Sequence, residues 1–160
     1  LVLCKDRFAS HSIDLQIESF DQNLKFLGRS TQISQVLLNL LNNAHDAVMD
    51  SAGKKWVKIS AVSLEHALEI RVTDCNPGIL PEIQRKMFQP FFTTKGVLGN
   101  LPVAEANLIP APVKVEHFSS GTGLGLFWSR KICREMRGSL VLKRAPASGQ
   151  SYFEVILKAA

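Results

Sequence analysis

Oxygen-bearing side chains recur at helical spacing in one segment of the sequence. Asn39, Asn43, Asp46 and Asp50 are separated by four, three and four residues, so at about 100° per residue they form one stripe along a helix. Mg²⁺ takes a few such oxygens together with water and substrate phosphates, rather than a full cage of protein ligands. The stripe indicates either a magnesium and phosphate edge or an ordinary solvated polar face.

A second candidate is Asp74, which ends an apolar alternating run and is followed by Cys-Asn-Pro-Gly-Ile up to Ile79. A carboxylate at the end of a strand, before a tight turn, can accept a hydrogen bond from an amino group of a ligand. Asp, Asn, Pro and Gly are also ordinary turn formers. An exit turn without any ligand is therefore the alternative interpretation.

The third candidate is the glycine-rich sequence Gly-Thr-Gly-Leu-Gly-Leu at residues 121–126, which opens a predicted helix. Free backbone N–H groups and the helix dipole at such a start favour phosphate, and glycine allows close approach. The segment lacks the Lys-Ser or Lys-Thr that closes a Walker loop, and it does not follow a strand as a dinucleotide fingerprint does. It predicts a different nucleotide-binding fold.

Hydrophobic periodicity predicts the elements that position these residues. A helix is expected after Ser30 or Thr31 as N-cap, running through Val48, and a second helix over 124–137 with Gly138 as its C-terminal stop. The first residues, Leu1 to Cys4, are read as a helix end left by trimming. Strands are expected over 13–17, over 57–61 and 68–72 as a hairpin through Glu65-His66-Ala67, and then around Val141 and over 152–157 about a turn at Gly149. The prediction is an α/β fold, a two-layer sandwich of a mixed sheet with helices on one face.

Composition limits the class of protein. The 160 residues, 46% hydrophobic and 21% charged, predict a single globular domain over 1–160. The net charge is +5, but the basic residues are scattered, so no nucleic-acid groove is expected.

The three cysteines and the apolar runs indicate the cellular setting. Cys4, Cys75 and Cys133 are odd in number and lack metal-ligand spacing, which predicts a reduced, cytoplasmic setting. No apolar run is long enough for a membrane span, so no membrane contact is expected of this domain.

These segments, taken together, resemble the catalytic ATP-binding domain of sensor histidine kinases, a branch of the GHKL superfamily with the Bergerat fold. Residues 35–47 resemble its N box, 74–79 its first glycine box, 88–95 its F box and 121–126 its second glycine box. The four boxes stand in the family's order and cover nearly the whole chain. The long, apolar segment Gly96 to Ser120 is then expected to be an ATP lid insertion.

The resemblance implies ATP and Mg²⁺ as cofactors and assigns roles at the polar stripe and the base site. Asn43 would hold the magnesium, and Asn39 would support it one turn earlier as a further catalytic residue. Asp74 would accept a hydrogen bond from the adenine amino group, and Gly78 with Ile79 would line the space beneath the base. Asn76 stands where the family usually has glycine, and Asn is the next best residue at positive φ.

On the phosphate side, Lys95 is expected to reach the terminal phosphate from the lid, with Thr94 beside it. Three phenylalanines of the F box are expected to pack and anchor the lid rather than to contact ligand: Phe88, Phe91 and Phe92. The second glycine box would line the phosphates through Gly121, Thr122, Gly123, Leu124 and Gly125.

Asn39 also separates the branches of the superfamily. Gyrase, Hsp90 and related ATPases carry Glu at the corresponding position, where a carboxylate can take a proton from water or a hydroxyl, whereas an amide has no useful basicity. The sequence therefore favours a histidine kinase over an ATP-hydrolysing machine. None of the four histidines, His11, His45, His66 and His117, is expected to be the phosphoacceptor, and all are predicted to be surface residues.

The acceptor histidine is expected on a separate dimerisation domain, and a response regulator receiver domain is the expected downstream partner. The alternative is an inactive module of the same fold that binds ATP or ADP and serves partner docking.

Overall fold

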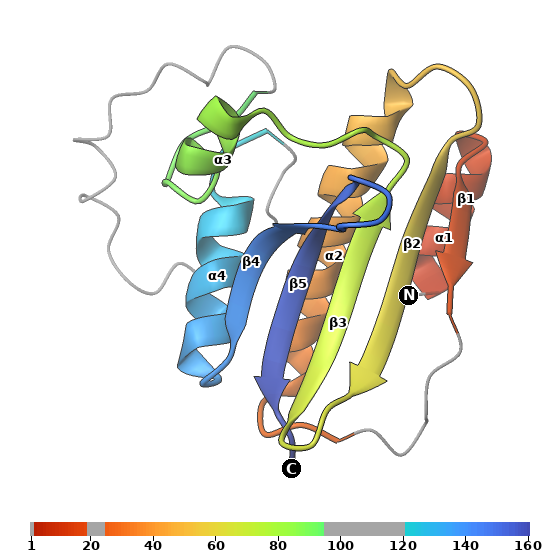
Figure 1. Ribbon diagram of the computed structural model, residues 1–160. Helices are drawn as coiled ribbons and strands as arrows, with labels where there is room; N and C mark the ends of the chain where they lie inside the picture. Colours follow the sequence, from red (N-terminus) through yellow and green to blue (C-terminus); the bar gives the residue numbers. More distant parts are fainter. Residues whose placement is uncertain (1, 19–24, 95–120) are drawn as a thin grey trace.

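The computed structural model describes residues 2–18, 25–94 and 121–160 (Figure 1). Its elements in chain order are α1 (Val2–Ser10), β1 (Asp14–Ile17), α2 (Ser30–Met49), β2 (Trp56–Ser63), β3 (Ala67–Asp74), α3 (Pro81–Lys86), α4 (Gly125–Glu135), β4 (Ser139–Arg144) and β5 (Ser151–Lys158). No helix within these ranges has the length and apolar character needed to cross a bilayer.

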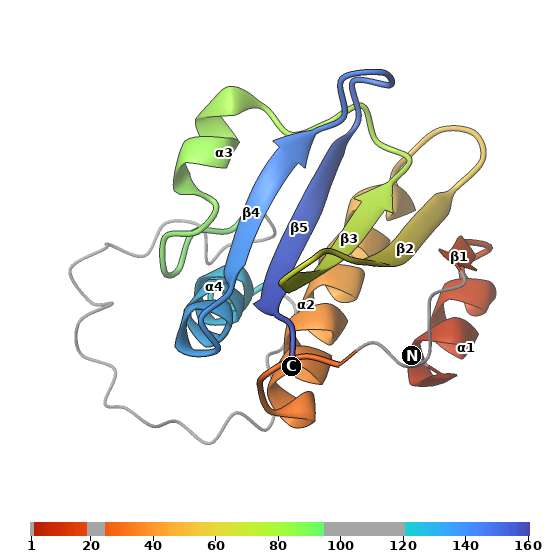
Figure 2. The same cartoon turned by 60° about the horizontal axis from the view of Figure 1, so that its bottom comes forward.

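The five strands form one sheet in the order β1-β2-β3-β5-β4. β1 runs parallel to β2, and the other neighbouring pairs are antiparallel. Figures 1 and 2 show α2 and α4 against one face of this sheet, with α1 beside α2 behind β1 and β2. The predicted α/β architecture, a mixed sheet with helices on one face, is confirmed.

The core lies between α2 and the sheet. The apolar stripe of α2 includes Val36, Leu40 and Val48, each with no exposed side-chain surface. It packs against inward-facing residues of the central strands, such as Val57 and Val155, in one cluster. Burying a Leu or Val side chain contributes roughly 1.5–3 kcal/mol, so this stripe anchors α2 and sets which of its faces is left for polar residues.

The start of α2 differs from the prediction. The helix begins at Ser30 with Arg29 as its N-cap, and no side chain caps it. The Arg29 carbonyl accepts hydrogen bonds from the N–H groups of Gln32 and Ile33, at 3.0 and 3.2 Å. The backbone therefore starts this helix, and the expectation of a Ser30 or Thr31 cap was wrong.

The end of α4 also differs in its chemistry. Arg137, not Gly138, adopts the left-handed conformation, with φ of 55°. The N–H of Gly138 donates to the carbonyl of Cys133 at 2.8 Å and that of Arg137 to Arg134 at 2.9 Å, which is the Schellman pattern. Gly138 is required for another reason, because a Cβ there would overlap the Ile156 carbonyl.

The short helix α3 was not predicted. Its signals are local ones: Pro81 at the first helical turn, Glu82 near the start, and Arg85 and Lys86 in the last turn. Proline suits a helix start and the charges complement the helix dipole. Such signals are weak in a helix of 6 residues.

Candidate functional site

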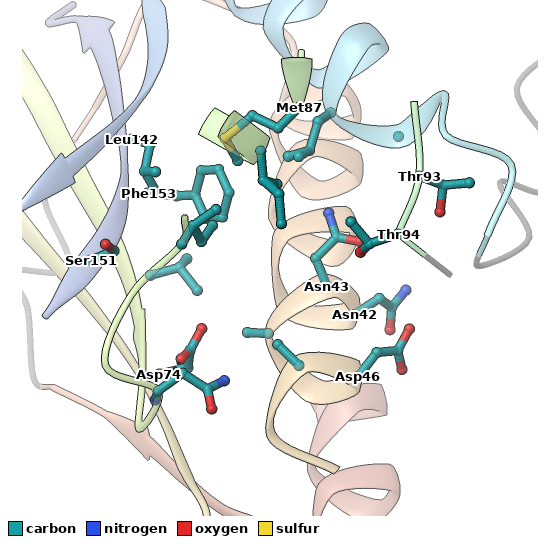
Figure 3. A pocket seen from close by; sticks show the side chains of 18 of the residues that line it. Asn42, Asn43, Asp46, Asp74, Met87, Thr93, Thr94, Leu142, Ser151 and Phe153 are labelled. Carbon is teal, nitrogen blue, oxygen red and sulfur yellow. Dashed lines mark hydrogen bonds between the residues drawn. The ribbon is translucent and has the colours of Figure 1, made fainter. Parts of the chain in front are cut away.

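A cavity of about 560 Å³ opens between α2, the end of β3, the start of β5 and the start of α4 (Figure 3). This volume is in the usual range for small-molecule and cofactor sites. Most of the predicted site residues line it: Asn39, Asn43, Asp74, Gly78, Ile79, Thr94, Gly121, Thr122, Gly123 and Gly125. The fold thus brings residues of all four motifs to one cavity.

One predicted residue within the described ranges is not among those lining it. Leu124 is the N-cap residue of α4, and its carbonyl accepts a hydrogen bond from the N–H of Trp128 at 3.0 Å, so it acts in the helix start. Lys95 and the predicted lid over 96–120 lie outside the described residues.

The polar stripe of α2 forms one wall. Asn39, Asn43, Asp46 and Asp50 all line the cavity, and Asn42 joins them. Figure 3 shows Asn42, Asn43 and Asp46 projecting from α2, with Asn42 and Asp46 on the side of the helix turned away from Asp74. The polar stripe is therefore a cavity wall, not merely a solvated face.

Asp74 stands opposite, at the end of β3. Its Oδ1 accepts a hydrogen bond from the backbone N–H of Asn76 at 2.9 Å. Burial raises the pKa of this carboxyl, and the hydrogen bonds from Asn76 offset only part of that effect. A carboxylate that is held by the turn and removed from bulk water is stabilised strongly when a ligand donates a hydrogen bond to it.

Asn76 does not adopt the positive φ that glycine would allow at this position. Among the described residues, positive φ outside glycine occurs only at Ser12, Phe91 and Arg137, so the expectation of a left-handed Asn76 was wrong. Its side-chain oxygen instead accepts a hydrogen bond from the Ser51 hydroxyl at 2.6 Å. Asn76 therefore ties the turn after β3 to the segment that follows α2.

Gly78, in the same turn, lines the cavity. Its φ is 135°, and a Cβ there would come within 2.9 Å of the Ser151 Oγ. The backbone angle strains any other residue, and a Cβ would also force the Ser151 hydroxyl to move. The turn can therefore approach β5 closely and leave room in the cavity.

Two glycines of the second glycine box lie so close to neighbouring residues that a Cβ would overlap them. Gly123 has φ of 68°, and a Cβ on it would overlap the backbone of Phe91 in the F box. A Cβ on Gly125 would overlap the Asn39 side chain. The Asn39 amide donates to the buried Ser129 hydroxyl at 3.0 Å, so α2 contacts both the start and the second turn of α4.

The three phenylalanines of the F box differ in their surroundings. Phe88 packs against the core and meets Phe153 edge to face, with ring centroids 6.5 Å apart, as predicted. Phe92 lines the cavity, which corrects its assignment to packing alone. Phe91 holds φ of 62°, a strained angle for an aromatic residue that places its backbone against Gly123.

Sequence reasoning also missed His45. It was predicted to be at the surface, but it is only 2% exposed. Its neighbour Asp46 lines the cavity, while His11 and His66 are exposed as expected. A histidine in a polar-looking segment gives no sign that another helix will cover it.

Comparison with known proteins decides the family. Residues 28–160 match the model of the histidine kinase-, DNA gyrase B- and HSP90-like ATPases. The chain belongs to this family. Within it, the two-component sensor PprA of Pseudomonas aeruginosa is 32% identical over 88% of the chain, and the C4-dicarboxylate transport sensor DctB of Rhizobium meliloti is 27% identical over 100%. The predicted histidine kinase ATP-binding domain is confirmed.

Solved histidine kinases share the fold. The catalytic domain of ThkA matches with a TM-score of 0.72 at 26% identity, covering 98% of this chain and 86% of that one. ThkA in complex with the response regulator TrrA matches with a TM-score of 0.69 at 22% identity, covering 99% and 38%. The chain spans only 13% of the length of PprA and 22% of DctB.

The charge of this histidine kinase site bears on its cofactor. Three carboxylates line the cavity, from Asp46, Asp50 and Asp74, whereas none of its described lining residues is Lys, Arg or His. A polyphosphate needs a cation to enter such a site. No described cluster of three or more His, Cys, Asp or Glu could hold a metal by itself. The donor set, an Asn43 amide with carboxylates farther along α2, fits Mg²⁺ shared with phosphates and water.

Proposed function

We propose that this domain binds ATP with Mg²⁺ and transfers the terminal phosphoryl group to a histidine on a separate dimerisation domain. The observation that carries the proposal is the placement of Asp74 and Asn43 on opposite walls of one cavity, with the second glycine box at its edge. One wall suits the base of a nucleotide and the other suits its phosphates.

At the base end, Asp74 is the acceptor for the adenine amino group. The Asn76 N–H fixes its Oδ1, so the carboxylate is oriented before ligand enters. Gly78 and Ile79 form the turn beside it, and Val72 and Phe153 add apolar surface to the same cavity. An aromatic base is matched by this mixture of one buried acceptor and apolar walls.

At the phosphate end, backbone N–H groups at the start of α4 are the donors. Gly121 and Gly123 hold φ of 107° and 68°, angles that expose backbone to a ligand. Asn43 and the neighbouring oxygens of α2 would hold Mg²⁺, which when bound offsets phosphate charge against the carboxylates. Thr94 adds a hydroxyl to this edge.

The residue one helical turn before Asn43 is not suited to activating water. Asn39 is an amide committed to Ser129, and an amide is not a general base. Phosphoryl transfer by such a site depends on positioning and charge compensation, with the nucleophile supplied as a neutral imidazole by another domain.

The partner domains belong to the same proposal. We place the acceptor histidine on a dimerisation domain and the next acceptor on a response regulator receiver domain, in the cytoplasm, with no contact to nucleic acid or membrane by this domain. The ThkA complex with TrrA supports a receiver partner for this fold.

The test of nucleotide binding is titration calorimetry with ATP, with and without Mg²⁺. Asn43→Ala should weaken the magnesium-dependent part of binding and leave the circular dichroism spectrum unchanged. Gln35→Ala, two turns earlier on the same helix, is the control and should bind as the unmodified chain does. An equal loss with and without Mg²⁺ would make Asn43 a structural residue.

The test of phosphoryl transfer uses the longer protein that carries the dimerisation domain. Incubation with labelled ATP should yield acid-labile, base-stable label, as expected for phosphohistidine. Nucleotide binding without any such label would support the docking module instead.

A further inference from the structure

A network of polar side chains joins α1 to α2 on the side of α2 that faces away from Asp74. Arg7 Nη1 donates to Asn42 Oδ1 at 2.8 Å and Arg7 Nη2 to Asp46 Oδ1 at 3.3 Å. His45 Nδ1 lies 3.0 Å from the same Asp46 oxygen, and His45 Nε2 lies 3.0 Å from His11 Nδ1. Arg7 of α1 and His11 in the turn after α1 thus converge on one carboxylate of α2, Arg7 directly and His11 through His45.

The hydrogen-bond partners of His45 and His11 determine which ring nitrogen of each histidine carries a proton. Asp46 is an acceptor, so His45 carries its proton on Nδ1, and Nε2 of the neutral ring accepts. His11 must then donate from Nδ1, and the same N–H faces the Arg7 carbonyl at 3.1 Å. A single arrangement satisfies every contact with both rings neutral.

The network is anchored by packing. His45 is 2% exposed and Phe8 is 1% exposed. Their rings meet edge to face with centroids 5.2 Å apart, and His11 meets His45 in the same way at 4.9 Å. Figures 1 and 2 both show α1 beside α2. The orientation of His45 therefore depends on α1 being docked.

Asn42 and Asp46 also line the cavity, on its α2 wall. The side chains of Asn42 and Asp46 connect α1 to the cavity. Arg7 of α1 donates hydrogen bonds to both of them, and both also form part of the cavity wall. Arg7 and His45 are not lining residues, so any effect they have on a ligand must act through α2.

We infer that the docking of α1 and the binding of nucleotide are coupled, with Arg7 and His45 as positioning residues that hold the Asp46 carboxylate at the cavity wall. The inference rests on the proposed binding of a nucleotide polyphosphate. When α1 is docked, the Arg7 guanidinium balances the Asp46 charge. When α1 moves away, the Asp46 carboxylate loses its ion pair with Arg7 and His45 loses its contact with His11, so the carboxylate repels the phosphates more strongly.

The coupling between α1 docking and nucleotide binding is positive. Undocking α1 lowers nucleotide affinity, and by reciprocity bound nucleotide strengthens the docking of α1 by the same factor. The Arg7 side chain is 43% exposed, so solvent screens the ion pair and the factor is modest, about fivefold.

The experiment measures ATP affinity in the presence of Mg²⁺ for variants of this chain. Arg7→Met should weaken binding about fivefold, and Arg7→Lys should recover part of it. Lys5→Met makes the same charge change on an exposed residue of α1 and should have no effect. In an Asp46→Asn background, which has no carboxylate to balance, Arg7→Met should change affinity little.

A pair of substitutions at His45 separates positioning from packing. The amide of Asn reaches about as far as Nδ1, so His45→Asn keeps a donor for Asp46, whereas the longer Gln reaches toward His11 instead. His45→Gln should weaken ATP binding more than His45→Asn, even though both are smaller than His and both lower the melting temperature. Equal affinities in the two variants would reduce His45 to a packing residue.

Hydrogen exchange tests the reverse direction. Adding ATP and Mg²⁺ should slow exchange of the α1 amides in the unmodified chain and not in Arg7→Met. Unchanged affinity in Arg7→Met, or the same loss in the Asp46→Asn background, would overturn the coupling while the proposed function stands. Absence of ATP binding by the unmodified chain would overturn the proposed function first.

Discussion

The Asn39 side chain fills the space that a Cβ on Gly125 would need. It also donates to Ser129, one turn farther along α4, at 3.0 Å. Asn39 therefore sets how closely α2 and α4 approach each other. Because Gly125 opens α4 at the edge of the cavity, this contact also positions the second glycine box.

Gly125→Ala is expected to destabilise the domain, although the same change inside an exposed helix would be stabilising by up to about 1 kcal/mol. Overpacking a fitted contact costs about 1–3 kcal/mol, so the free energy of unfolding in urea should fall by that amount. Adding Asn39→Ala should recover part of the loss, because it empties the overlapped space. Strictly additive losses in the double variant would refute the contact.

Asp74 predicts a preference for ATP over GTP. The guanine carbonyl would face the carboxylate as a second acceptor, and an unpaired buried polar contact costs about 1–3 kcal/mol, so the preference should be on the order of tenfold to a hundredfold. Asp74→Asn should erode it, since an amide can turn its NH₂ toward the guanine carbonyl. Competition of both nucleotides against a fluorescent ATP analogue measures the ratio, and equal affinities in the unmodified domain would remove Asp74 from the base site.

The domain alone should neither label itself on histidine nor hydrolyse ATP quickly. Of the histidines in the described residues, His45 is buried, and neither His11 nor His66 lines the cavity. Asn39, committed to Ser129, cannot act as a base for water. Incubation with labelled ATP and assay of released phosphate test both points. Substantial turnover by the isolated domain would move it to the gyrase and chaperone class.

Cys133 should be the slowest thiol to alkylate near neutral pH. Burial raises its pKa to about 11, and the thiolate is the reactive form. Cys75, which is partly exposed, should react first with iodoacetamide, as read by peptide mass spectrometry. Early labelling of Cys133 would mean that the packing of α4 opens readily.

The same shift predicts a pH dependence of stability. A folded-state pKa above the ordinary thiol value means that the native state binds more protons between the two values. The contribution of the neutral Cys133 thiol is therefore fully present below about pH 9 and is lost as pH rises through about 11. Cys133→Ala should lose less stability than the unmodified domain over that range, although its absolute stability is lower.

The motifs and the periodicity of the sequence were sufficient to predict the α/β class, α2, the β2 and β3 hairpin, and residues that line one cavity, among them Asn43, Asp74 and the second glycine box. Each of these follows from local spacing. An apolar stripe at helical period must face a core, and the polar residues one step around the helix must lie at its edge. The helix ends differed from the prediction: backbone groups replaced the expected side-chain cap at Arg29, and Arg137 took the left-handed conformation at the predicted Gly138 stop.

Only the tertiary structure decided the contacts between elements. Asn39 and Ser129 are 90 residues apart, and His45 and His11 are 34 apart, so no local pattern pairs them. Periodicity reports which face of a helix is buried, but it does not report which neighbour covers that face or in what register. A polar residue such as His45 is predicted to be at the surface, because burial is favourable only when its hydrogen-bond partners are in place, and one of them, His11, lies far away in the sequence.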